Sequence, residues 1–126
     1  MSSYDFFAAQ LRFVAARTPA DDLDVTAMMA HLTHIADLAE KVDVGGTISV
    51  ATDDLKFAGR ALAGVAGFLQ QHILPEVVAA ENARGERQVR WVIDTAMELM
   101  AAMTVAAEQA DERDQMTFDL PAPPDI

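Results

Sequence analysis

Hydrophobic residues recur at intervals of three and four along most of the chain, which is the spacing of one face of an α-helix. Residues 3–17 show it at Phe7, Leu11 and Val14. Over residues 19–42 the apolar positions alternate by three and four without a break, as along the contact seam of an antiparallel helical bundle. This seam comprises Val25, Met28, Leu32, Ile35, Ala39 and Val42. We therefore expect two helices in this first part of the chain.

A third helix is predicted from about Leu55, because Thr52-Asp53-Asp54 before it suits a helix start. Pro75 has no backbone N–H to donate, so we expect this helix to kink there. Residues 58–67 are almost all small. Each interior glycine costs about 1 kcal/mol of helix propensity relative to alanine. Such a cost is expected where a neighbouring backbone approaches closely.

The fourth helix is predicted over residues 86–111, after a break at residues 82–85. Its apolar seam comprises Val89, Ile93, Ala96, Met100, Met103 and Ala107. Four amphipathic segments with short connections predict an all-α fold, a four-helix bundle of the up-down type. We expect one bundle domain over residues 1–112 and an extended or disordered C-terminal tail over residues 113–126.

Residues 44–50 interrupt the helical pattern. Two glycines break it, and residues 47–50 alternate in the way of a short strand. We interpret the segment as a crossover loop, because no second strand-like run inside the chain offers a pairing partner. Pairing with a second copy of the chain is the alternative.

The composition of the 126 residues limits which kinds of reactive and metal-binding site the chain can form. There is no cysteine, which excludes disulfides, a thiol nucleophile and thiolate metal sites. The chain begins MSSYDFF, without a basic region before an apolar run, so we expect no signal peptide and a cytoplasmic location. The longest uncharged stretch is too short to span a bilayer.

The net charge of −11 limits the classes of partner that the chain can bind directly. A field of this sign repels nucleic acids and anionic membranes, so we predict neither as a direct partner. Solubility is the plain explanation for so many carboxylates. The alternative is an acidic surface that mimics nucleic acid and blocks a basic protein, as in inhibitors of phage or immunity type.

The three histidines are candidate metal ligands. His31 and His34 lie one helical turn apart, and His72 precedes Glu76 at i, i+4. Helical bundles hold metals between facing helices with Glu-x-x-His pairs, and none occurs here. A metal-binding carboxylate and histidine bundle remains an alternative, but we predict no metal and no cofactor. Without a phosphate-binding loop or a nucleophile elbow, we also predict that the protein is not an enzyme.

Arginine is concentrated just before the one tryptophan. Arg84, Arg87 and Arg90 precede Trp91, and arginine and tryptophan are the residues most enriched at interface hot spots. We therefore single out Arg84, Arg87 and Trp91 as candidate partner-binding residues. The alternative is a solvated helix end in which Arg87 stacks on Trp91.

The C-terminal stretch Gln115-Met116-Thr117-Phe118-Asp119-Leu120 has large apolar side chains on alternate positions, as in a peptide that binds extended across pockets. It resembles the bacterial sliding-clamp-binding motif: glutamine, a leucine or methionine, any residue, a large apolar residue, often a spacer, and a final leucine or phenylalanine. The resemblance implies that Gln115 binds a polar subsite and that Met116, Phe118 and Leu120 fill apolar pockets. Alternatively, Phe118 and Leu120 fold back and cover a groove on the bundle.

These observations predict a non-catalytic, acidic helical adaptor or regulatory protein that acts through protein–protein contacts. The replication sliding clamp is a candidate partner for its tail. The apolar surface of residues 44–50, of the phenylalanines outside the first seam and of Trp91 leads us to expect a homodimer.

Overall fold

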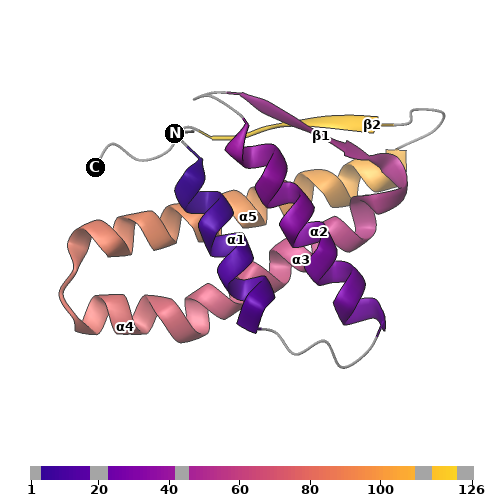
Figure 1. Ribbon diagram of the computed structural model, residues 1–126. Coiled ribbons are helices and arrows are strands. Elements are labelled where there is room, and N and C mark those ends of the chain that lie inside the picture. Colours follow the sequence, from indigo (N-terminus) through magenta and orange to yellow (C-terminus); the bar gives the residue numbers. More distant parts are fainter. Residues whose placement is uncertain (1–3, 18–22, 42–45, 110–114, 122–126) are drawn as a thin grey trace.

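All four predicted helical segments form helices, and they pack together as a bundle to which a small two-stranded sheet is added (Figure 1). The computed structural model describes residues 4–17, 23–41, 46–109 and 115–121. The elements are α1 (Asp5–Arg17), α2 (Leu23–Glu40), β1 (Thr47–Ala51), α3 (Leu55–Phe68), α4 (Leu74–Ala79), α5 (Ala83–Gln109) and β2 (Gln115–Asp119). A 3₁₀ turn, η1 (Thr52–Asp54), precedes α3, and a π-helical turn, η2 (Leu69–Ile73), follows it.

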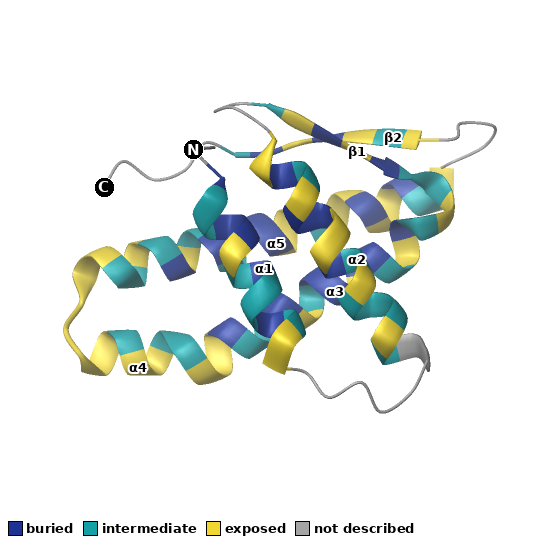
Figure 2. Ribbon diagram, viewed as in Figure 1, coloured by how far each residue is buried: buried dark blue, intermediate teal, exposed yellow. Residues whose placement is uncertain are grey.

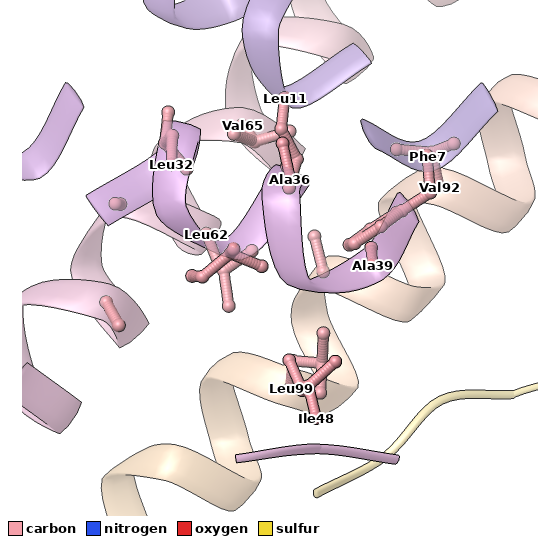
Figure 3. Close-up of a cluster of buried hydrophobic side chains, with 14 of the residues drawn as sticks. Phe7, Leu11, Leu32, Ala36, Ala39, Ile48, Leu62, Val65, Val92 and Leu99 are labelled. Atoms are coloured by element: carbon pink, nitrogen blue, oxygen red, sulfur yellow. The ribbon is translucent and has the colours of Figure 1, made fainter. Parts of the chain in front are cut away.

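The first two helices bury the faces that their spacing predicts. On α1, Phe7, Leu11 and Val14 are buried. On α2 the buried residues include Leu32, Ile35 and Ala39, whereas Val42 lies outside the described residues. The two helices lie next to each other and cross α3 and α5 (Figure 1). Their buried side chains belong to one apolar cluster with α3, α5 and β1 (Figure 3).

The irregularity predicted at Pro75 takes the form of a π-helical turn just before it. The N–H of Leu74 donates to the carbonyl of Leu69, five residues back, so the helix widens by one residue per turn. Pro75 then occupies the first turn of α4, where its missing N–H leaves no helical bond unmade.

The connection between α4 and α5 is a tightly hydrogen-bonded turn. The N–H of Glu81 donates to Val78 (3.0 Å), and that of Asn82 donates to Val77 (3.2 Å). Glu81 has a φ of 56°, the left-handed conformation that ends many helices. The side-chain Oδ1 of Asn82 then accepts from the N–H of Gly85 (3.0 Å) and caps α5. The break therefore spans residues 80–82, earlier than the predicted 82–85, and α5 begins at Ala83 rather than at residue 86.

The prediction of a loop at residues 44–50 is wrong for its described part. β1 pairs antiparallel with β2, with Ile48 opposite Phe118 and Val50 opposite Met116. The buried and exposed residues of both strands alternate, so the sheet covers the bundle with its apolar face. The missing partner strand was the C-terminal segment, which is extended as predicted but paired with β1.

Half of the predicted seam of α5 is buried as predicted, at Val89, Ala96 and Met103, and the other half is displaced by one residue. The buried apolar positions are Val89, Val92, Ala96, Leu99, Met103 and Ala106. Ile93, Met100 and Ala107, which belong to the predicted seam, are only half-buried. One residue corresponds to a rotation of about 100° around a helix, so α5 presents a second apolar face beside its buried one.

Candidate interaction surfaces

The three histidines do not converge on a common site. The His31 ring stacks on Phe57 of α3 with a centroid distance of 6.0 Å, and His72 lies against Phe68 at 5.0 Å. His34 is exposed on α2. Within the described ranges, no three or more histidine, aspartate or glutamate side chains gather as a metal site would require.

Trp91 faces the start of α1 rather than the arginines. Its ring stacks with Tyr4 at a centroid distance of 6.1 Å and meets Phe7 edge-on at 6.0 Å. It is half-buried. Arg84 and Arg87 are exposed near the beginning of α5. Trp91 therefore packs α5 against the start of α1, whereas the two arginines are exposed to solvent.

Those arginines belong to a helical hairpin that extends beyond α1. It consists of α4 and the first turns of α5, and most of its residues are exposed (Figure 2). Arg90 forms an ion pair with Glu86 at 3.4 Å, one turn away on the same helix. Val78 is 47 % exposed on the outside of α4. The hairpin combines exposed arginines with an apolar side chain, which is an ordinary mixture for a contact surface.

The hexapeptide that resembles the clamp-binding motif is bound by its own chain. Phe118 and Leu120 are 7 % and 3 % exposed, Met116 is half-buried and Gln115 is exposed. The N–H of Leu120 donates to the carbonyl of Gly46 at 3.1 Å. In this conformation, two of the three apolar side chains that the motif would insert into a clamp, Phe118 and Leu120, are already buried against the bundle.

Two acidic residues of α2 are neutralised by a basic residue of α1. The Arg12 guanidinium donates to the carboxylates of Glu40 and Asp37. These hydrogen bonds raise the pKa of Arg12, with Glu40 making the larger contribution. Asp37 and Glu40 are therefore paired within the chain, although both side chains stay largely exposed.

A groove between α3 and α5 is the surface that the sequence analysis did not identify. It has a volume of about 320 Å³ and is lined by Lys56, Gly59, Arg60, Ala63, Met100, Thr104, Ala107 and Glu108. Nearer the start of α5, a smaller hollow of about 150 Å³ is lined by Gln70 of η2, Leu74 of α4, and Arg90, Ile93 and Asp94 of α5. We call the surface that joins these two hollows the α3–α5 face.

The wall that α5 contributes is a second regular apolar seam. Ile93, Met97, Met100, Thr104 and Ala107 are separated by four, three, four and three residues, one position after the buried seam. Every one of them is half-buried or exposed, and Met97 is 44 % exposed. Two overlapping seams on one helix are typical of a helix with two packing partners. The two seams are visible in the sequence as pairs of adjacent apolar residues, Val92 with Ile93 and Leu99 with Met100.

Three glycines of α3 show how closely its neighbours approach. A Cβ at Gly59 would lie 3.7 Å from the carbonyl oxygen of Met100 and 3.8 Å from Thr104 Oγ1, which is ordinary van der Waals contact with α5. A Cβ at Gly64 or Gly67 would meet no described atom within 4 Å. The described part of the chain therefore makes no approach at these three positions that a side chain would prevent.

Comparisons with known proteins give no further guide: no family model, curated protein or solved structure matches the chain. None of the described helices is both long enough and apolar enough to cross a membrane. The α3–α5 face must be judged by its own geometry.

Proposed function

We propose that the protein is a non-catalytic adaptor that acts through protein–protein contacts, and that the α3–α5 face is its main contact surface. The observation that supports this most directly is the second seam of α5. A single-faced helix would carry a polar residue at Met97, because an exposed position gains little from a large apolar side chain, whereas Met100 already packs partly against the core. Full burial of such a side chain contributes about 1.5–3 kcal/mol, which a partner would supply.

The shape of the face favours a helix as the binding element. α3 and α5 pack side by side, and a third helix can lie along the groove between two such helices with its apolar residues inserted. Lys56, Arg60 and Glu108 stand at the rim of the larger hollow. An apolar floor with a charged rim is the usual anatomy of a specific protein interface.

Arg84 and Arg87 are proposed as a secondary contact on the projecting hairpin. They are exposed and lie apart from the groove. A charged rim or arm changes association rates and salt dependence more than it changes affinity. We therefore assign the main binding energy to the α3–α5 face and orientation to the hairpin.

The test is cross-linking at a defined position in the cells that make the protein. A photoreactive amino acid replaces Met100 in the groove, and in a matched control it replaces Val78 on the hairpin. We expect a protein adduct at Met100 that disappears when Met97→Glu is added, because a buried carboxylate opposes docking. Absence of any protein adduct at Met100, or an adduct that Met97→Glu leaves unchanged, would refute the proposal.

A further inference from the structure

We infer that the α3–α5 face binds an amphipathic helix of another protein, with acidic residues along one flank of its apolar stripe and basic residues along the other. This inference rests on the proposed function of the same face, and it names the chemistry of the partner. The observation that carries it is the distribution of charge across the groove.

Charge is divided between the two helices that form the groove. Lys56 and Arg60, one turn apart, are the only charged residues of α3, and both line the larger hollow. In residues 91–109 of α5, by contrast, every charged residue is acidic. Two of these lie on the face, Glu108 in the larger hollow and Asp94 in the smaller one. The groove therefore has a basic edge on α3 and an acidic edge on α5.

The charges of both edges are available to a partner. Within the described ranges, no ion pair includes any of the four edge residues, and all four are exposed: Lys56, Arg60, Asp94 and Glu108. Arg90 is the one basic residue of α5 that lines either hollow, and it already has an ion pair with the preceding turn of its own helix. The two edges can therefore attract complementary side chains of a docked segment.

An apolar strip lies between the two edges. Ala63 of α3 and Met100 and Ala107 of α5 line the larger hollow, and Met97 is 44 % exposed one turn before Met100. The hollow, at about 320 Å³, has room for large side chains that enter from outside. A helix fills such a groove with apolar residues at three- and four-residue spacing.

The two edges then set the charges of the docked helix. A helix that lies along the groove has one flank over α3 and the other over α5. The flank over Lys56 and Arg60 is attracted if it is acidic, and the flank over Asp94 and Glu108 is attracted if it is basic. A helix with the same charge on both flanks would be repelled at one edge. The net charge of −11 favours a basic partner at long range, but the local charge along α3 is positive.

Two synthetic peptides test this charge pattern. Both are amphipathic helices of the same composition, with leucines at three- and four-residue spacing. One has all its glutamates on one flank of the leucine stripe and all its lysines on the other, whereas the control has both kinds on both flanks. We expect the segregated peptide to bind the intact protein about tenfold more tightly at low salt, because several ion pairs each contribute a little. Fluorescence anisotropy measures both dissociation constants.

Variants of the protein show where the peptide binds. Arg60→Glu should reduce the preference for the segregated peptide severalfold. Lys41→Glu makes the same change of charge just after α2 and should leave the preference unchanged. Both residues are exposed, so neither substitution disturbs the core. Met97→Glu should abolish binding of both peptides. Equal binding of the two peptides to the wild-type protein, or no binding of either at high concentration, would overturn the inference.

The natural partner supplies a second measurement, which also separates this inference from the proposed function. Mass spectrometry of the adduct at Met100 identifies the cross-linked segment, and we expect an amphipathic helix with segregated flanks. A segment without that pattern, or a second copy of this chain, would overturn the inference and leave the α3–α5 face standing as a contact surface. Absence of any adduct at Met100 would refute the proposed function, and the inference with it.

Discussion

The hydroxyl of Tyr4 donates a 3.3 Å hydrogen bond to the backbone carbonyl of Leu120, although 116 positions separate the two residues. Both are buried, with exposures of 0 % and 3 %. The Tyr4 ring also stacks with Trp91, so the residue that precedes α1 contacts both α5 and the segment after β2. The C-terminal segment is in this way an integral part of the fold rather than an appendage to the bundle.

The Tyr4→Phe variant tests this connection. It keeps the ring against Trp91 and removes only the hydroxyl that serves the Leu120 carbonyl. We expect the free energy of unfolding to fall by about 1 kcal/mol, the usual effect of removing one buried hydrogen bond. Urea unfolding followed by circular dichroism measures it. Unchanged stability would mean that this hydrogen bond contributes nothing in solution.

The Phe118→Ala variant tests how firmly β2 is held. Phe118 is opposite Ile48 in the sheet and is 7 % exposed, so its loss leaves a cavity in the cover of the core. We expect a destabilisation of about 3 kcal/mol. Gln115→Ala in the same strand is the control, because Gln115 is exposed and should change stability by about 0.5 kcal/mol or less. Equal effects of the two substitutions would show that β2 is not packed as described.

Helix periodicity in the sequence was sufficient to predict the bundle. The spacing of Phe7, Leu11 and Val14, and that of Leu32, Ile35 and Ala39, reports local geometry that recurs every turn. The sheet was missed because strand pairing is not local. Ser49 and Thr117, whose side-chain oxygens lie 3.3 Å apart, are 68 residues apart in sequence. Each strand has only five residues, and alternation over so short a segment does not show which other segment it pairs with.

The α3–α5 face was missed for a different reason. The regular spacing of Ile93, Met100 and Ala107 is equally compatible with a core seam and with an interface seam, and the sequence alone does not say which of two overlapping seams is covered. The small residues of α3 led us to expect a closely approaching backbone. The structure shows instead that a Cβ at Gly59 would make only ordinary contact with α5 and that one at Gly64 would meet no described atom within 4 Å.

The turn at the tip of the hairpin offers two substitutions with opposite expected signs. Glu81 has a positive φ, which disfavours residues with a Cβ by about 1 kcal/mol or more. Glu81→Gly should therefore raise the midpoint of thermal unfolding. Gly85→Ala should lower it despite the better helix propensity of alanine, because the new Cβ would lie 2.7 Å from Asn82 Nδ2 and would disturb the cap.

The control for this pair is Ala83→Gly in the same first turn of α5. It lowers the helix propensity and leaves the hydrogen bond from the Gly85 N–H to Asn82 Oδ1 in place. It should lower stability modestly. If Gly85→Ala were stabilising instead, the Asn82 cap would have to be absent or readily rearranged in solution.

Binding of the tail to a sliding clamp would require a change in the conformation of β2 and Leu120. Phe118 and Leu120 must leave the bundle before another protein can bind them, which exposes two large apolar side chains at a cost of about 3 kcal/mol or more. A free peptide of residues 113–126 has no such cost. We therefore expect the peptide to bind purified bacterial clamp at least about a hundredfold more tightly than the intact chain.

Fluorescence anisotropy with labelled peptide, and competition by the intact chain, measures both affinities. Gln115→Ala distinguishes recognition of the motif from nonspecific hydrophobic binding, because Gln115 is exposed and does not pack against the bundle. In the peptide this substitution should abolish clamp binding, and in the protein it should leave the fold intact. Equal affinities for peptide and protein would mean that β2 is already free in solution, against the structure. A peptide without measurable binding would remove the clamp from the candidate partners, because nothing but these six residues suggests it.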